Sequence, residues 1–257
     1  MQMPRKFGWK PDAQDPRDFH YALPAALDAR PVPPIIRLHD RDFEPPVWNQ
    51  LNAGACTAFG HGYGAYIADQ MDGRPLGFTP SLLAIYGHSR ILDGDFETDE
   101  GAQPRNVCKA LAKFGMFDQK LWPYDTAKLF DKGFLAFNKL GAQHRTLQYQ
   151  NVPKDKAHID QVLASGFPVI FGAMLYKSSQ TPEVDKTGIV PMLAKYDEPI
   201  GGHCMAICGK DDEKGWYVVR NSWGAEMGDK GYYYFPYDYI LGNLTFTADF
   251  RVIKRVA

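Results

Sequence analysis

The strongest constraint on the fold is a change of hydrophobic pattern near Gly166. Before it, apolar residues recur at helical spacing. After it, short runs rich in Val, Ile and Tyr alternate with turn residues, as strands do. A helical first half and a β second half predict an α+β fold, with the site for chemistry in the cleft where they meet. We expect an extended arm over residues 1–44, a mainly helical lobe over 45–150 and a mainly β lobe over 151–257.

Each predicted helix has an apolar stripe and end signals; the helices cover residues 56–70, 79–92, 104–114 and 155–165. Gly60, Gly62 and Gly64 lie inside the first, where each costs up to ~1 kcal/mol relative to Ala, so we expect close backbone packing there. Thr79 should cap the second helix, with Pro80 at its first position. Strands are predicted at residues 167–176, 187–190, 203–211, 215–223, 231–236 and 248–254.

The charge balance limits the possible partners. The 29 Lys and Arg against 30 Asp and Glu leave a net charge of −1, which argues against nucleic acid or an anionic membrane as partner. No segment approaches the roughly 20 apolar residues of a membrane span. The N-terminus also lacks the apolar run of a secretory signal. We therefore expect a soluble protein of the cytoplasm.

The four cysteines predict neither a disulfide nor a metal site. Cys204 and Cys208 lie in one predicted strand, roughly 13 Å apart, which exceeds disulfide reach. A chain without disulfides fits a reducing compartment. Zinc on His203, Cys204 and Cys208 is disfavoured because adjacent strand residues point to opposite faces. We expect no metal and no cofactor.

Cys56 is the first candidate for chemistry, because it opens a predicted helix. The positive end of the helix dipole and the unpaired N–H groups there favour a thiolate and lower the pKa of the thiol. The same N–H groups can stabilise an oxyanion, and the Gln50 amide could donate a second hydrogen bond. The alternative is that Cys56 is a small buried hydrophobe, as most free cysteines are.

His203 and Asn221 are the matching candidates in the β half. Two glycines before His203 leave its ring unobstructed. The Asn221 oxygen could accept from one imidazole nitrogen and aim the other at a thiol, sheltered by Trp223. The alternatives are an ordinary histidine and an ordinary turn. His203 comes 147 residues after Cys56, and Asn221 follows 18 residues later.

Together these residues resemble the papain-like cysteine peptidases of family C1, in a prokaryotic form without a long propeptide. The Cys-to-His interval falls in the range of that family. Further matching segments are the Gln50–Cys56 spacing, Glu100-Gly101-Ala102, LWPYD at 121–125 and NSWG at 221–224. The similarity covers nearly the whole chain.

The resemblance implies a two-lobe fold with a helical lobe and an antiparallel, barrel-like β lobe. It also implies a monomeric cysteine peptidase that hydrolyses polypeptides. Cys56 and His203 would rest as a thiolate–imidazolium pair, with Asn221 orienting the imidazole and Gln50 in the oxyanion hole. Substrate-binding residues would be Gly101, Ala102, Gly202, Met174 and Trp223. We expect an apolar or aromatic side chain two residues before the cleaved bond.

Some positions depart from the family pattern. Ala53 stands where a cysteine is usual, Thr57 replaces an aromatic residue, and Met227 replaces a second tryptophan. Two other functions therefore stay open: a peptide-binding protein that has lost catalysis, and a cysteine-dependent acyl transferase or amidase. The arm could inhibit the enzyme by lying along the cleft, or it could simply pack on the surface.

Overall fold

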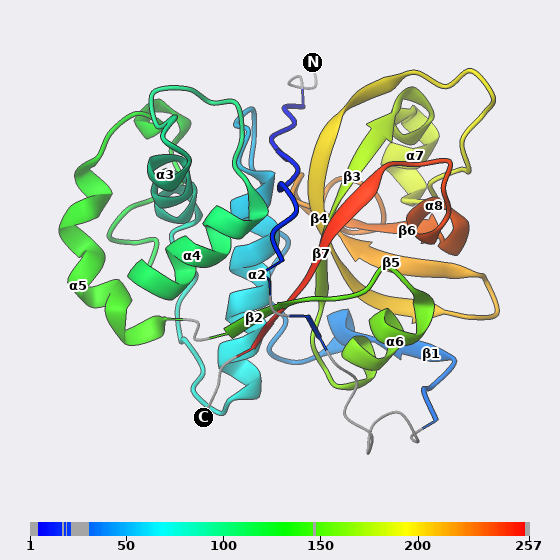
Figure 1. The fold of residues 1–257 in the computed structure, drawn as a ribbon, viewed down its shortest axis with the longest axis horizontal. Helices are drawn as coiled ribbons and strands as arrows, with labels where there is room; N and C mark the ends of the chain where they lie inside the picture. Colours follow the sequence, from blue (N-terminus) through cyan, green and yellow to red (C-terminus); the bar gives the residue numbers. More distant parts are fainter. Residues whose placement is uncertain (1–4, 17, 19, 22–30, 146–147, 255–257) are drawn as a thin grey trace.

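The chain folds into a helical half and a sheet half, which pack against each other along helix α2 (Figure 1). The computed structural model describes residues 5–16, 18, 20–21, 31–145 and 148–254. The helical half contains α2 (Cys56–Met71), α3 (Leu82–Asp93), α4 (Pro104–Phe114) and α5 (Asn138–Gly141). The predicted α+β class is confirmed.

The sheet half is built on antiparallel strands: β1 (Ile35–Arg37), β2 (Gln148–Asn151), β3 (Val169–Tyr176), β4 (Pro199–Asp211), β5 (Trp216–Arg220), β6 (Tyr232–Pro236) and β7 (Thr247–Lys254). The strand order is β2-β7-β3-β4-β5-β6, with β1 paired to the end of β4. This sheet stays open, so the expected barrel-like lobe is a curved sheet rather than a closed barrel. Shorter elements beside it are α6 (Lys156–Ala164), α7 (Pro182–Thr187) and α8 (Tyr237–Leu241).

Short 3-10 turns complete the described elements. They cover Leu38–Asp40, Thr126–Lys128, Gly133–Phe137, Ala142–His144 and Lys177–Gln180. Most of them lie in the segments that join the longer helices and strands, where a few residues must reverse the chain.

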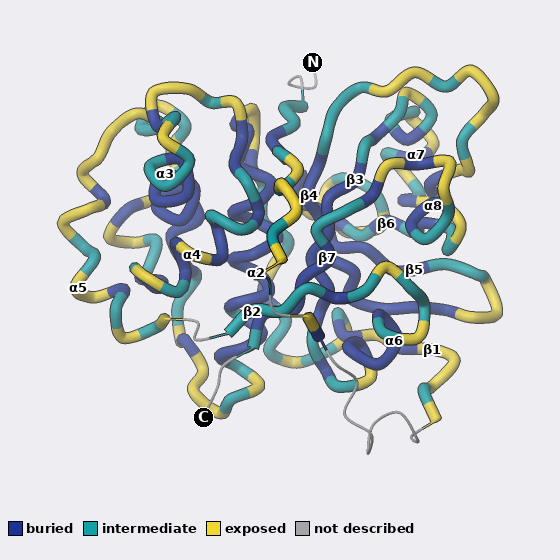
Figure 2. The backbone as a smooth tube through the Cα atoms, in the orientation of Figure 1, coloured by how far each residue is buried: buried dark blue, intermediate teal, exposed yellow. Residues whose placement is uncertain are grey.

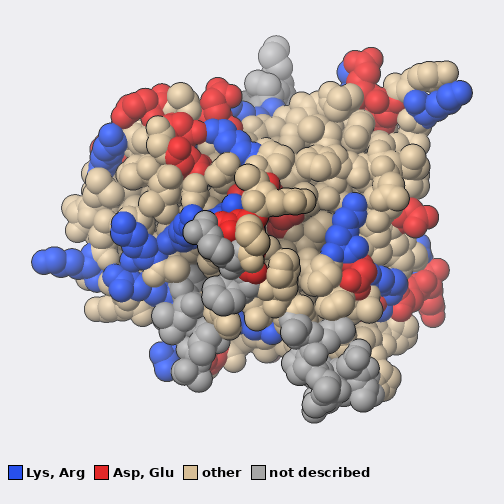
Figure 3. Space-filling view, viewed as in Figure 1, with Lys and Arg blue, Asp and Glu red and all other residues tan. Residues whose placement is uncertain are grey.

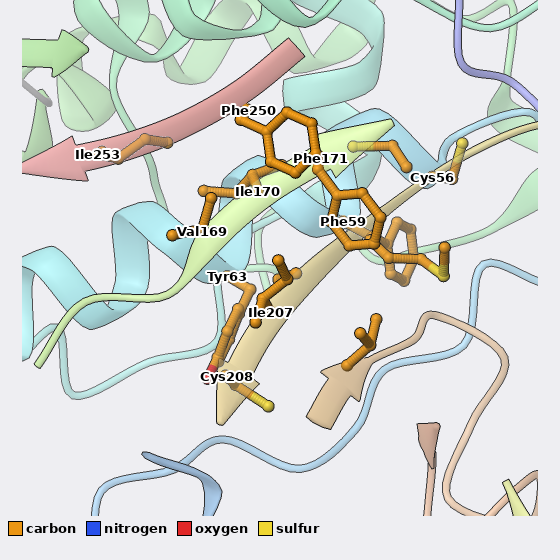
Figure 4. Packing of buried hydrophobic residues seen from close by; sticks show 14 of the residues in the cluster. Cys56, Phe59, Tyr63, Val169, Ile170, Phe171, Ile207, Cys208, Phe250 and Ile253 are labelled. Carbon is orange, nitrogen blue, oxygen red and sulfur yellow. The ribbon is translucent and has the colours of Figure 1, made fainter. Parts of the chain in front are cut away.

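Helix α2 is buried along most of its length, because both halves pack on it (Figure 2). Figure 4 shows the apolar side chains that meet there, among them Phe59, Tyr63, Ile170, Phe171 and Phe250. The helix glycines make this approach possible. A Cβ on Gly64 would lie 2.6 Å from Cδ1 of Ile170, and one on Gly62 would lie 2.6 Å from Cδ2 of Leu82. The expected close packing of these glycines is therefore confirmed.

The predicted start of the second helix is wrong. α3 begins at Leu82, and the Ser81 hydroxyl accepts a hydrogen bond from the Ala84 amide at 3.4 Å as its cap. Thr79 and Pro80 are instead paired with the segment after α4: the Thr79 carbonyl accepts from Gln119 at 2.9 Å. This long-range backbone pairing outweighs the local preference of Thr-Pro for a helix start.

The predicted strand at residues 187–190 is also wrong. Thr187 ends α7, and Gly188 takes a left-handed conformation with φ +72° as its cap. Ile189 then makes only an isolated bridge to Tyr234. The apolar run is too short, and too close to a helix end, to extend into a strand.

The described part of the N-terminal arm runs between the two halves, where it is the dark blue segment of Figure 1. Its backbone pairs with both sides. The Ala102 amide donates to the Gly8 carbonyl at 3.0 Å, and the Trp9 amide donates to the Gly202 carbonyl at 3.0 Å. Residues 1–4, 17, 19 and 22–30 of the predicted arm lie outside the described residues. The arm does not simply pack on the surface, because its Trp9 side chain is buried and only 5% exposed.

Charges of both signs are interspersed on the face seen in Figure 3, in keeping with the net charge of −1. Among the helices of the described ranges, none combines the length and apolar character needed to cross a lipid bilayer.

Candidate active site

Cys56 is the first residue of α2, and it is completely buried. Its sulfur contacts backbone amides from three directions: Thr57 in the helix, Cys204 in β4 and Gly8 in the arm. Burial raises the pKa of the Cys56 thiol to about 11, although these amides act in the opposite sense. The thiolate predicted from the helix dipole is therefore not the favoured form beneath the arm.

His203 in β4 is held by Asn221, which follows β5. Nε2 of His203 and Oδ1 of Asn221 are 2.8 Å apart, and the same Oδ1 accepts from the Ser222 amide at 2.7 Å. Since Oδ1 only accepts, Nε2 carries the hydrogen and Nδ1 has the free lone pair. The Trp223 ring stacks on the imidazole, with centroids 4.7 Å apart. This is the arrangement that the sequence predicted for these three side chains.

The free nitrogen of His203 is buried and has no hydrogen-bond partner among the described residues, Cys56 included. Burial lowers the pKa of His203 to about 4, with a smaller contribution from Arg5. Beneath the arm, burial therefore acts against both charges of the expected thiolate–imidazolium pair. The two groups are nevertheless neighbours, since the Cys56 sulfur contacts the amide of the residue after His203.

Gln50 lies on the other side of Cys56, and its amide is oriented by Ser222. The Ser222 hydroxyl donates to Oε1 of Gln50 at 2.5 Å. Nε2 is therefore directed to the Lys6 carbonyl of the arm at 3.0 Å and to the Ala53 carbonyl at 2.7 Å. The sequence analysis did not predict this role for Ser222. Its position between Asn221 and Trp223, two predicted site residues, could have indicated it.

The predicted substrate-binding positions are occupied by the arm. Ala102 pairs with the arm through both its amide and its carbonyl, and Gly202 does so through its carbonyl. Gly101 allows this approach, because a Cβ there would lie 2.0 Å from the Gly8 carbonyl oxygen. Met174 lies opposite Gly202 in the β3–β4 register.

Ion pairs secure the arm to the sheet half. Arg5 pairs with Asp185 at 2.5 Å and lies over the Trp223 ring, with 4.2 Å between the guanidinium carbon and the ring centroid. Asp12 pairs with Arg251 at 2.5 Å, and both side chains are almost fully buried. A buried pair of this kind is costly to break from one side only. The arm contacts had no signal in the local pattern of the sequence.

The zinc alternative is not supported by the geometry. Cys204 packs toward Gly60 of α2, whereas the Cys208 thiol is directed to the Val218 carbonyl in β5. Over the described ranges, no three His, Cys, Asp or Glu side chains are grouped so that they could hold a metal ion. All four cysteines are free thiols.

Known proteins share this fold and much of the sequence. Residues 45–239 match the family described as papain family cysteine protease. An uncharacterized peptidase C1-like protein of Acanthamoeba polyphaga mimivirus is 32% identical over 216 residues, which span 81% of this chain and 69% of the relative. Cysteine proteinase 2 of Zea mays is 27% identical over 195 residues, 73% of this chain but only about half (51%) of that protein.

Solved structures agree with these relatives. Xylellain, a cysteine protease from Xylella fastidiosa, superposes with a TM-score of 0.87 at 31% identity, covering 100% of this chain and 98% of xylellain. Bromelain from Ananas comosus shares the fold, with a TM-score of 0.65 at 20% identity over 88% of this chain and 100% of bromelain. The fold and these matches define a cysteine peptidase. The chain belongs to the papain family of cysteine proteases.

Proposed function

We propose that this chain hydrolyses peptide bonds with Cys56 as the nucleophile and His203 as the acid–base group. The thiol proton passes to Nδ1 of His203, and the sulfur bonds to the substrate carbonyl carbon. The C–N bond then breaks as His203 returns the proton to the leaving amine. Water, deprotonated by His203, next displaces the sulfur and releases the acid. Asn221 keeps Nδ1 directed at the thiol throughout.

One observation carries this proposal: the buried, unpartnered Nδ1 of His203 in a ring whose other nitrogen is fixed by Asn221. A buried imidazole nitrogen without a partner is costly in a merely structural histidine. A histidine that accepts the proton of the neighbouring thiol, in contrast, needs a nitrogen that is free to bind that proton. The Cys56 amide and Nε2 of Gln50 would stabilise the oxyanion.

We further propose that the arm inhibits the enzyme in this state. The Gly8 amide faces the Cys56 sulfur, so the arm presents an N–H there rather than a carbonyl carbon open to attack. The Lys6 carbonyl occupies the hydrogen-bond donor of Gln50. The arm thus blocks the nucleophile and the oxyanion donor without being placed as a substrate.

Alkylation of Cys56 by iodoacetamide tests both proposals. With a pKa near 11, only about 10⁻⁴ of the thiol is ionised at pH 7, so the intact chain should react slowly and faster as the pH rises. In full-length Gly8→Ala, whose added Cβ would lie 1.9 Å from the Gly54 carbonyl oxygen, displacement of the arm should give fast labelling at pH 7. Peptide mapping should find the label on Cys56 rather than Cys108, which is also buried. Equal labelling of both thiols would contradict a catalytic role.

Gln50→Ala should reduce kcat by about 10²–10³, because one oxyanion donor is lost. The substitution is made in full-length Gly8→Ala, which serves as the parent, and kcat is measured with a fluorogenic dipeptide amide as the substrate. Ser222→Ala should cause a smaller loss, since it only frees the Gln50 amide to turn. A kcat within twofold of the parent for Gln50→Ala, at unchanged melting temperature, would exclude Gln50 from the oxyanion site.

A further inference from the structure

A narrow slot in the sheet half holds the indole of Trp9. One side of the slot is bare backbone, since a Cβ on Gly172 of β3 would lie 1.9 Å from Cε2 of the indole. Phe246 lies against the ring, with centroids 5.5 Å apart and planes inclined by 30°. Gly202 also borders the ring, because its Cβ would lie 3.0 Å from Cε3. The slot thus fits a flat aromatic side chain.

The slot ends in a carboxylate. Nε1 of Trp9 donates to Oδ2 of Asp249 at 2.8 Å, and the Asp12 amide donates to the same oxygen at 3.2 Å. Asp249 has φ +58°, a left-handed conformation that is uncommon for a residue other than glycine. It lies where the β3–β7 pairing shifts register, between Ile170↔Arg251 and Gly172↔Ala248. A bulge of this kind redirects a side chain, here into the slot.

A substrate would use the same slot if its backbone pairs with the groups that hold the arm, although the arm itself is not placed for cleavage. Ala102 pairs with Gly8 and Lys10 on either side of Trp9, and the Gly202 carbonyl accepts from the Trp9 amide. Ala102 and Gly202 are both positions predicted for substrate binding. An extended polypeptide on those groups places one side chain against Gly172 and Asp249. This step rests on the proposed peptidase function.

The charges near the slot favour a substrate side chain that is neutral and donates a hydrogen bond. Arg251 and Asp12 are the charged groups that act on Asp249, and Asp12 belongs to the arm. Once the arm leaves, the buried Arg251 guanidinium loses Asp12 and stays near Asp249. A basic substrate side chain would then meet this positive charge. An indole N–H meets the acceptor without that repulsion.

We propose that Asp249 is a specificity-determining residue, and that the slot selects a tryptophan side chain in the substrate polypeptide. This goes beyond the apolar or aromatic preference expected from the sequence. The carboxylate distinguishes tryptophan from an aromatic side chain without a hydrogen-bond donor, such as phenylalanine, because a site built around a hydrogen bond rejects an analogue that cannot form it.

The test compares peptide amides that differ only two residues before the cleaved bond, with Trp, benzothienylalanine, Phe or Arg there. Benzothienylalanine has the shape of tryptophan but carries sulfur in place of the N–H. The enzyme is full-length Gly8→Ala, alone and combined with Asp249→Gly or Asp249→Asn. Glycine and asparagine both tolerate the left-handed backbone. Glycine removes the acceptor, whereas asparagine keeps an accepting oxygen and serves as the matched control.

The parent should show kcat/KM about tenfold higher for Trp than for benzothienylalanine, and Asp249→Asn should keep most of that ratio. Asp249→Gly should bring the ratio near one. Equal rates for the two substrates in the parent, a ratio unchanged by Asp249→Gly, or a preference for Arg would overturn the inference. If iodoacetamide labels Cys56 quickly but none of the four substrates is cleaved, the proposed peptidase function fails, and this inference with it.

Discussion

Full-length Gly8→Ala is expected to turn over a small peptide amide about 10 to 100 times faster than the unaltered chain. The new Cβ would lie 1.9 Å from the Gly54 carbonyl oxygen, which is a backbone atom and cannot rotate away as a flexible side chain could. Overpacking of this kind costs about 1–3 kcal/mol, which corresponds to roughly one to two factors of ten in the population of displaced arm. The substitution lies on the arm, so His203 and Asn221 keep their hydrogen bond.

The assay measures kcat/KM at neutral pH with a fluorogenic dipeptide amide. Gln14→Ala is the matched control, because Gln14 is an exposed arm residue and should leave turnover unchanged. Trp9→Ala is a second route to the same result, since it empties the slot and leaves Gly54 undisturbed. Unchanged turnover in both Gly8→Ala and Trp9→Ala would mean that the arm does not inhibit.

Cys56→Ala in the Gly8→Ala chain should abolish turnover, with a loss of at least about 10⁴-fold. Removal of the nucleophile leaves only the binding groups and the oxyanion donors, which retain a small fraction of the rate. Alanine fits the site with little disturbance, because Cys56 is small and buried. The same dipeptide amide is used, and both proteins are assayed at equal concentration measured by absorbance, because Cys56→Ala has no active-site thiol to titrate.

Cys108→Ala is the matched control, since Cys108 is an equally buried free thiol in α4. It should keep the turnover of the parent, even if the melting temperature falls slightly. Retained turnover in Cys56→Ala would exclude this thiol as the nucleophile. The activity would then have to come from another group.

Local features of the sequence predicted the structure correctly where interactions between neighbouring residues determine it. The start of α2 at Cys56 follows from the periodicity of its apolar residues. Gly115 and Gly166 follow the ends of α4 and α6, with φ of +71° and +93°, as glycine at a helix end allows. The Asn221–His203 hydrogen bond was also predicted correctly, because His203 lies in β4 and Asn221 directly follows β5, the strand paired with it.

Prediction failed where a residue can bond either to its neighbours in the sequence or to a distant segment. Thr79 looked like a helix cap, but its carbonyl pairs with Gln119. Asp249 carries no motif, and its direction depends on a register shift between β3 and β7. The pKa shifts of Cys56 and His203 also depend on burial, to which a segment nearly fifty residues away from Cys56 in the chain contributes.

The sequence by itself determined the α+β pattern, the helix that presents Cys56, and the residue types able to perform thiol chemistry. These follow from hydrogen bonding and side-chain periodicity within short segments. Only the tertiary structure decided that Gly8 covers the sulfur, that Trp9 fills a slot ending at Asp249, and that burial disfavours the charged forms of the thiol and the imidazole. Those contacts and the effect of burial on the two pKa values depend on solvent exclusion and on the approach of distant segments, and a linear pattern of residues specifies neither.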